Sequence, residues 1–591
     1  MRLRLLGFIV CLLTPTLVLA QSGQRLTPAQ LRELERQARL LYEQTQEFMR
    51  LQQKSGKTAK KARHIEPKPT HCNLPSPKRA AQFSQEVLPG IPLGDRYALY
   101  VGACGLGDVV KLTQQLVRFQ TVNGEEPPAK NPEVVAMGLF LQQWAKARGF
   151  DFRVAGRKDV FELSWGEGPP LLGLVFHGDV APAAADEWKY KPFEPTVVNG
   201  RLYGRGVMDD KGPLATALIS LAMAQEMGLT PQKGKVLVII GNDEESSWLG
   251  MQEYARTEQL PTHIISVDSG YPVVVAQSGV VALNLEAMLG TVESADAAML
   301  LPVDASAGEA LNQVPAAASL SLVPFAGKSM DQGLAAAKAA VDATRKERAG
   351  LKAEVKVVSV PGSGSRIVIS TQGKAAQSSS PEEGRNALWD LAAIADKLPL
   401  ADNGLTAVLQ LVTRRFDGDH HGERLGFTET DPFMGAVTAA PTLLRVKSGK
   451  VTLAINMRRP RSSEGNEDFH QALDHAIALI NQESDGRIVE GRGRFVSDPH
   501  VTDSKSPLVA TLIDIYRRHR NIRGVLEPIS IRGNTYARLF PRGVDFGPGI
   551  QELGPYTGHK ADEFISLDHL GVSTQMLAEA IHALALSSNA P

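Results

Sequence analysis

Three short apolar runs, separated by a helix-like stretch and by turns, constrain the fold of this chain more than any other feature. The runs are LLGLVF (171–176), VLVII (236–240) and HIISV (263–267), and each has the length and apolar character of a buried strand. Between the first two lies PLATALISLAMAQEM (213–227), which reads as a helix. Strand, helix and strand in this order predict a parallel sheet with crossover helices.

The character of the chain changes after this region, and 591 residues are too many for one ordinary core. Residues 291–350 and 385–400 are Ala-rich and helix-like, and strand-like pieces such as AEVKVVSV and KVTLAINMR lie between and after them. We therefore predict an inserted α+β domain over 291–504. The first domain, over 105–290 and 505–591, is predicted as an α/β fold with a mixed, mostly parallel sheet and helices on both faces.

The N-terminal segment MRLRLLGFIVCLLTPTLVLA has the layout of a secretory signal. Arg2 and Arg4 precede an apolar run, and Val18-Leu19-Ala20 supplies a small or branched residue at each recognition position. We predict a signal peptide over 1–20, cut after Ala20, and a secreted or periplasmic protein; an uncleaved anchor is the alternative. Residues 21–104 are predicted as a helical extension and linker.

Cleavage would leave two cysteines, Cys72 and Cys104. In an oxidising compartment such a pair predicts a disulfide, with two buried thiols as the alternative. Closing a loop of this length would stabilise the fold by roughly 3–4 kcal/mol.

Charge excludes other classes of partner. Lys plus Arg and Asp plus Glu both number 64, so the chain has no basic surplus for nucleic acid. Its one strongly apolar stretch is the N-terminal segment, which excludes a multi-spanning membrane protein. We expect no membrane contact after signal cleavage.

Polar residues follow each of the three predicted strands. His177-Gly178-Asp179 follows the first, Asn242–Glu245 the second and Asp268 the third. Ligands bind at the carboxyl ends of strands in open parallel sheets, and histidine with carboxylates but no cysteine suits a divalent cation such as zinc. Asp209-Asp210 precedes the predicted helix, where two adjacent carboxylates would repel each other without a cation. Taken alone, His177 could be an ordinary surface or core histidine, and Glu244-Glu245 could simply be the acidic first turn of a helix.

Four motifs give these residues a family context: DEW (186–188), PFEP (192–195), LYGRGVMDDKGP (202–213) and NDEES (242–246). On these motifs the chain resembles the di-zinc aminoacylase, carboxypeptidase and dipeptidase family of metallopeptidases, and within it the PepV-type (Sapep-like) bacterial dipeptidases. The resemblance covers roughly residues 105–590. It implies a zinc-exopeptidase-like catalytic domain and a lid formed by the insert.

The resemblance also implies five ligands for two zinc ions. They are His177 and Asp268 on one ion, Glu245 and His559 on the other, and Asp209 bridging both. Such a pair produces a hydroxide nucleophile at neutral pH, and cobalt or manganese can fill similar sites. Asp179 would orient the ring of His177, and Glu244 would be the general base.

Substrate-binding residues are implied in the same way. They are Asn312, Gln377, Arg458, Gly533, Asn534 and Thr535. Arg458 can grip a carboxylate with two hydrogen bonds. Gln377 stands where the family usually has a histidine thought to stabilise the oxyanion. A neutral amide can still donate there, so we expect altered substrate preference or reduced turnover.

Together these observations predict a secreted, zinc-dependent dipeptidase acting on dipeptides or short peptides with a free C-terminal carboxylate. The same metals also cut other amides, so an N-acyl amino acid hydrolase is one alternative. A zinc-binding scaffold without turnover is the other. A monomer and a homodimer both stay open.

Overall fold

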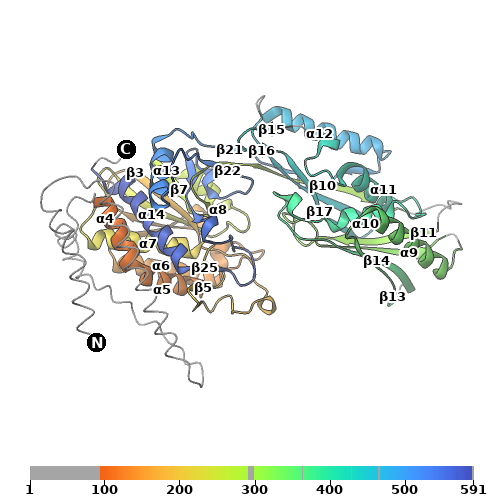
Figure 1. Cartoon of the computed structure of the whole chain (residues 1–591), viewed down its shortest axis with the longest axis horizontal. Coiled ribbons are helices and arrows are strands. Elements are labelled where there is room, and N and C mark those ends of the chain that lie inside the picture. The colour runs from red at the N-terminus through yellow and green to blue at the C-terminus, as the bar shows by residue number, and fades with distance from the viewer. Residues whose placement is uncertain are drawn as a thin grey trace, which may run out of the picture. The chain divides into compact units, whose positions relative to one another are not determined.

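The computed structural model describes residues 93–290, 299–325, 327–362, 364–427, 429–462 and 466–588. The chain forms two compact units (Figure 1). Within the described residues, unit 1 comprises 93–273, 503–528 and 535–588, and unit 2 comprises 274–502 and 529–534.

Unit 1 is built on a sheet whose strands are ordered β1-β2-β6-β3-β7-β23. Their bounds are β1 Asp151–Ala155, β2 Val160–Trp165, β6 Lys235–Gly241, β3 Pro170–His177, β7 His263–Ser266 and β23 Gly543–Asp545. β3 pairs in parallel with β6 and β7, and β23 in parallel with β7, whereas β1 and β2 pair antiparallel. The predicted mixed, mostly parallel sheet is confirmed.

Strand β3 is buried at every position. Its sequence PLLGLVFH is therefore a continuous apolar run, without the alternation of a half-exposed strand, because both faces of a parallel sheet are covered. On one face, Met251 and Tyr254 of α8 (Leu249–Thr257) share a buried cluster with Val175 of β3. On the other, α7 (Lys211–Glu226) packs against the same strand. The sheet thus carries helices on both faces, as predicted.

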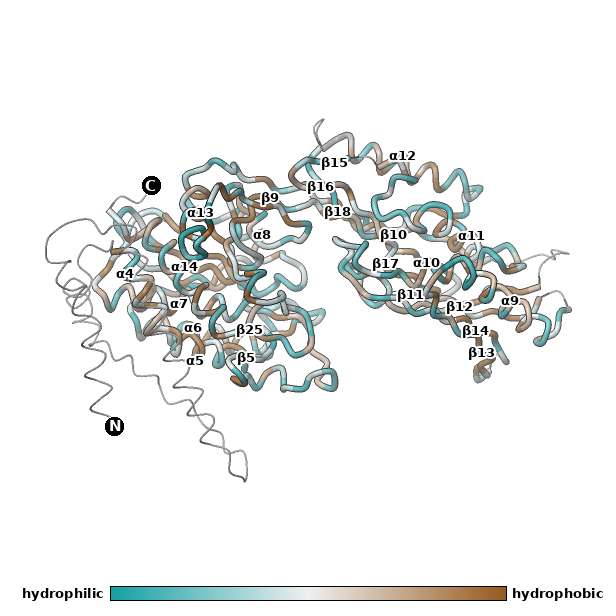
Figure 2. The backbone as a smooth tube through the Cα atoms, viewed as in Figure 1, coloured by the Kyte–Doolittle hydropathy of each residue, from teal (hydrophilic) through white to brown (hydrophobic). Residues whose placement is uncertain are grey.

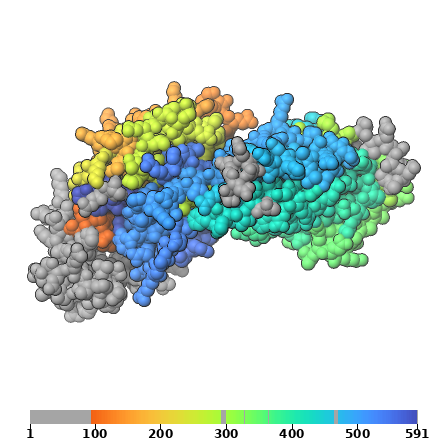
Figure 3. Space-filling view, turned by 90° about the horizontal axis from the view of Figure 1, so that it is seen from above, coloured from red at the N-terminus to blue at the C-terminus, as the bar shows by residue number. Residues whose placement is uncertain are grey.

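Further helices surround α7, which is buried from Lys211 to Ala224. Both α5 (Leu106–Val117) and α14 (Leu567–Ile581) pack on it, and α4 (Leu93–Tyr100) and α13 (Pro507–His519) pack on α14. The yellow and blue parts of unit 1 in Figure 3 form one continuous surface, so segments far apart in sequence make a single unit. No helix among the described residues is both long enough and apolar enough to span a membrane.

Unit 2 is an α+β fold on an antiparallel sheet, ordered β13-β14-β12-β11-β17-β18-β10-β19, with β20 also on β10. The bounds are β13 Lys352–Val360, β14 Gly364–Gln372, β12 Ala317–Pro324, β11 Leu300–Ala307, β17 Thr438–Lys447, β18 Lys450–Arg459, β10 Gly279–Met288, β19 Ile488–Glu490 and β20 Phe495–Val496. Helices α9 (Met330–Glu347), α10 (Ala387–Ala395), α11 (Gly404–Leu411) and α12 (Asn466–Glu483) pack against it around one apolar core. In both units the core elements carry long brown stretches in Figure 2, whereas many connecting loops are teal.

The limits of unit 2 differ from the predicted insert. Unit 2 begins at Val274 and not at residue 291, because β10 pairs along its whole length with β18. It also contains residues 529–534, which were assigned to the first domain, since β22 (Ile529–Ile531) pairs in parallel with β9 (Val274–Gln277). Neither long-range pairing is visible in the local sequence pattern.

Most of the predicted N-terminal features lie outside the described residues. These are the signal peptide over 1–20 and the extension as far as residue 92, including Cys72. Cys104 lies in the π-helical turn Val101–Gly105 that links α4 to α5. The pairing of Cys72 with Cys104 stays a prediction.

Candidate metal centre

The centre in unit 1 is formed where neighbouring strands end. His177 is the last residue of β3, and it stands beside Gly241, the last residue of β6. Glu244 and Glu245 follow β6 within a few residues, and Asp268 follows β7. Because these strands are parallel neighbours, their carboxyl ends place the predicted ligands at one edge of the sheet.

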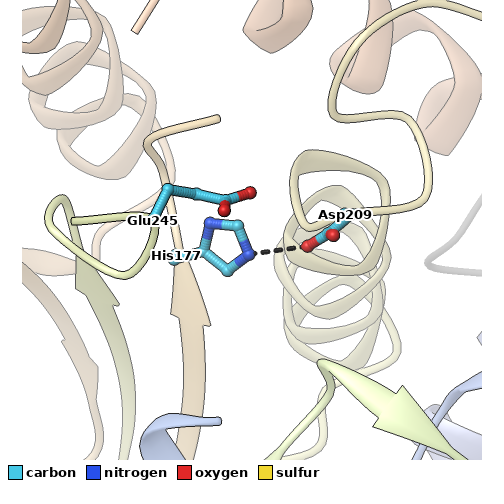
Figure 4. A group of neighbouring side chains, drawn as sticks. All are labelled: His177, Asp209 and Glu245. Atoms are coloured by element: carbon cyan, nitrogen blue, oxygen red, sulfur yellow. Dashed lines mark hydrogen bonds and ion pairs between the residues drawn. The ribbon is translucent and has the colours of Figure 1, made fainter. Parts of the chain in front are cut away.

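Asp209 lies between two imidazoles and contacts both. Its Oδ1 is 2.8 Å from Nε2 of His177, and its Oδ2 is 3.2 Å from Nε2 of His559. Figure 4 shows His177 and Asp209 facing each other, with Glu245 close to the same ring. The peptide bond between Asp209 and Asp210 is cis.

Each imidazole has a second acidic neighbour. Glu245 Oε1 is 2.8 Å from Nε2 of His559, and Asp268 Oδ1 is 3.7 Å from Nε2 of His177. The structure thus brings together all five predicted ligands, in two pairs that share Asp209.

These side chains have the composition and spacing of a metal site. One ligand atom each from His177, Asp209 and Glu245 lies within 4.8 Å of the others, and the same holds for His177, Glu244 and Asp268. Nitrogen and oxygen donors without a thiol suit zinc and similar divalent cations.

The balance of charge also fits a cation. Burial and the nearby Asp268 raise the pKa of Glu244 well above its usual range. Burial raises the pKa of Asp268 to about 7, although the His177 ring opposes the shift. Burial lowers the pKa of His559, but its bonds to Asp209 and Glu245 outweigh burial and raise it to about 11. The buried acids outnumber the imidazoles, so positive charge would stabilise the cluster.

Asp179 holds the loop that carries the two glutamates. Its Oδ1 accepts the backbone N–H of Glu244 at 3.1 Å, and its Oδ2 accepts that of Glu245 at 3.0 Å. The nearest oxygen to Nδ1 of His177 is the main-chain oxygen of Asp179, at 2.9 Å, whereas the carboxylate is 3.7 Å away. Asp179 was predicted to orient the ring of His177, and its carboxylate also positions the backbone of Glu244 and Glu245.

Glu563 supports Asp209, although no sequence motif pointed to Glu563 as a functional residue. Its carboxylate is fully buried and accepts the backbone N–H groups of Gly206, Met208 and Asp209 at 2.9–3.2 Å. It also pairs with Arg205 at 2.8 Å. These bonds fix the loop before α7 in which Asp209 lies. Within the motif GHKADEFI, the only local sign of this role is an acidic residue beside apolar ones. The residues that Glu563 binds are too distant in sequence to be inferred.

The DEW motif contributes to the same support. The guanidinium of Arg205 lies 5.1 Å from the centre of the Trp188 ring, an arrangement that favours a cation–π contact. The DEW motif and the LYGRGVMDDKGP motif thus contact each other next to the loop that carries Asp209.

We expect Glu563→Gln to weaken zinc binding by about 10–100-fold, the usual effect of losing a group that orients a ligand. An amide has one acceptor oxygen and would turn an NH₂ group toward N–H donors. Competition with a chromophoric chelator would measure the affinity. Glu552→Gln, at an exposed glutamate, is the matched control. Equal affinities for the variant, the control and the wild type would contradict this prediction.

Five of the six predicted substrate-binding residues lie in unit 2. Asn312 and Gln377 lie on adjacent segments, because Ser378 N–H donates to the Asn312 carbonyl at 2.9 Å. Both side chains are exposed. Ser379 Oγ donates to Oε1 of Gln377 at 3.2 Å, which leaves the Gln377 NH₂ group as a donor.

The other predicted residues are divided between the units. Arg458 lies on β18, flanked by β10 and β17. Gly533 and Asn534 belong to unit 2, and both amide atoms of Asn534 are buried without a hydrogen-bond partner among the described residues. Thr535 belongs to unit 1, where its Oγ1 donates to Oδ1 of Asp545 at 2.7 Å.

Comparison with known proteins gives this geometry a context. The model of "Peptidase family M20/M25/M40" matches residues 173–583, a segment that contains all five predicted ligands. The chain is 30% identical over 488 residues to "Putative dipeptidase YtjP" of Bacillus subtilis strain 168, covering 81% of this chain and 97% of that protein. It is 30% identical over 476 residues to "Beta-Ala-Xaa dipeptidase" of Lactobacillus delbrueckii subsp. lactis, covering 79% and 92%. Among solved structures, human carnosine dipeptidase 1 aligns with a TM-score of 0.48 and 14% identity, covering 83% and 98%.

Proposed function

The chain belongs to peptidase family M20/M25/M40, and from that premise we propose that it is a secreted dipeptidase using two zinc ions. As a member it is a metallopeptidase, a hydrolase of peptide C–N bonds. Its substrates would be dipeptides, the substrates named for the two dipeptidase relatives, or short peptides with a free C-terminal carboxylate. The observation that carries the proposal is the Asp209 carboxylate between His177 and His559.

The residues at the centre would hold one ion with His177 and Asp268 and the other with Glu245 and His559, while Asp209 serves both. Bound there, the cations lower the pKa of a water molecule and polarise the scissile carbonyl. Cobalt or manganese can replace zinc in such a donor set.

Glu244 would move the proton. It takes a proton from the attacking water as the new C–O bond forms, and it delivers that proton to the leaving nitrogen as the C–N bond breaks. Asp179 fixes this base, since its carboxylate accepts the Glu244 N–H at 3.1 Å. The guanidinium of Arg458 would bind the free carboxylate of the substrate through two hydrogen bonds.

A purified-protein screen tests the proposal. Dipeptides and N-acyl amino acids would be offered to the protein while its metal content is measured. We expect the protein to hydrolyse dipeptides. A chelator should abolish this hydrolysis, and added zinc should restore it. Preferential hydrolysis of acyl amino acids would show an N-acyl amino acid hydrolase. Bound metal without turnover, together with a silent Glu244→Ala variant, would show a scaffold.

Secretion and the disulfide are parts of the same proposal. The mature protein should begin at Gln21, which N-terminal sequencing would detect. Thiol labelling of the denatured, unreduced protein should find no free cysteine at Cys72 or Cys104. A mature chain that keeps residues 1–20, or labelling at both cysteines, would contradict this part alone.

Gln377→His is expected to raise or redirect activity across the substrate panel. An imidazolium donates a charge-assisted hydrogen bond, which is roughly twice as strong as one from a neutral amide. Values of kcat and KM for each substrate would be compared with those of Gln372→His, a control at an exposed glutamine on β14. A substrate profile equal to that of the wild type would refute a role for this position.

A further inference from the structure

A tyrosine outside the predicted site lies against the bridging carboxylate. The Tyr556 ring and the Asp209 carboxylate both lie beside the same residue, Gly558. Tyr556 precedes His559 in the segment GPYTGHK, so the same short loop supplies a metal-ligand candidate and this phenol.

Gly558 allows this approach. A Cβ atom added to Gly558 would lie 2.6 Å from Cε1 and 2.9 Å from Cζ of Tyr556, and 2.7 Å from Oδ2 of Asp209. Cζ of Tyr556, which carries the hydroxyl, thus lies within 3 Å of this Cβ position, and so does Oδ2 of Asp209. Any larger residue at 558 would separate them.

The backbone between Tyr556 and Gly558 is fixed beside the Asp209 loop. The Thr557 N–H lies 3.2 Å from Sδ of Met208, and Thr557 Oγ1 donates to the main-chain oxygen of Phe564 at 2.6 Å. Lys560 Nζ donates to the main-chain oxygen of Tyr556 at 3.1 Å. These bonds fix the main chain from which the Tyr556 ring extends.

The Tyr556 ring also stays accessible. Tyr556 is 37% exposed, whereas Asp209 is only 5% exposed. Part of Tyr556 is therefore open to a molecule at the centre, although the carboxylate itself is covered.

We propose that Tyr556 is a catalytic residue that donates a hydrogen bond from its phenol to the scissile carbonyl oxygen as that oxygen becomes negative. This inference rests on the proposed function. With metal bound, the Asp209 carboxylate would act as a ligand and would be less available to the phenol as an acceptor. The phenol hydrogen then needs another acceptor at the same centre, and the developing oxyanion is one.

The step requires no proton from the phenol. The water oxygen bonds to the carbonyl carbon, the C=O π electron pair moves to oxygen, and this oxygen accepts the hydrogen bond. When the C=O bond re-forms, the C–N bond breaks and Glu244 gives its proton to the nitrogen.

Tyr556→Phe tests the inference, because it removes the hydroxyl and keeps the ring. Loss of one oxyanion donor costs about 10²–10³-fold in kcat, so we expect a fall in kcat of about that size with little change in KM. A tetrahedral phosphinate dipeptide should bind weaker by a similar factor, while the metal content stays at the wild-type value. Tyr100→Phe, on α4, is the matched control.

Two results would overturn the inference. One is a kcat and a phosphinate affinity equal to those of the wild type. The other is a loss of bound zinc in proportion to the loss of kcat, which would assign Tyr556 to the support of Asp209 alone. If the wild type hydrolyses no peptide, the proposed function fails; phosphinate binding that depends on the Tyr556 hydroxyl would then still support the donor. A wild type that binds no phosphinate would overturn both.

Discussion

Glu244→Gln is expected to lower kcat by about 10²–10⁴-fold, the range that general acid–base catalysis contributes. Gln keeps the size of the side chain and its place beside Asp268, but it cannot accept and release a proton. Steady-state kinetics on the best dipeptide would measure the loss, and metal analysis would show whether both ions remain.

Glu167→Gln is the control for this variant, because Glu167 is exposed in a turn before β3. It should behave as the wild type. A Glu244→Gln enzyme with its metals and a kcat within a few-fold of the wild-type value would remove Glu244 from the mechanism.

Removal of the metal is expected to abolish hydrolysis and to lower the melting temperature. Without cations the buried carboxylate of Asp209 and the half-buried ones of Glu244 and Asp268 lie close together, which destabilises the fold. A ligand bound only by the folded state stabilises it by about 4 kcal/mol at a thousand times its Kd. Calorimetry after dialysis against a chelator, and again after addition of zinc, would measure both transitions.

Asp209→Asn should remove most of this response to zinc, because the bridging residue would carry no charge. Asp151→Asn, at an exposed position at the start of β1, should leave the response intact. Full activity in a protein shown to be free of metal would contradict the proposed mechanism.

The sheet of unit 1 could be predicted because its signal is local. Buried parallel strands leave continuous apolar runs, and a functional residue such as His177 directly follows the run that positions it. The ligand candidates His177 and Asp268 could be proposed from this rule alone, whereas His559 needed the family resemblance. The residues that orient these ligands could not be proposed in this way. The N–H groups of Met208 and Asp209 donate to Glu563, which lies more than 350 residues away along the chain.

The boundary of unit 2 was misplaced for a similar reason. The strand GVVALNLEAM (279–288) reads as a strand of either unit, and only its pairing with β18 assigns it. Tyr556 carries no sequence signal at all, because its role depends on the small size of Gly558 and on the distant Asp209.

Glu563 and His559 have a consequence for biosynthesis. The loop at 205–209 is translated early. The carboxylate that binds its N–H groups and the second imidazole are translated 350 or more residues later. A nascent chain thus has no complete centre until the residues around 563 have left the ribosome. We therefore expect a chain that stops before His559 to show no peptidase activity, and an unfinished polypeptide to hydrolyse no substrate.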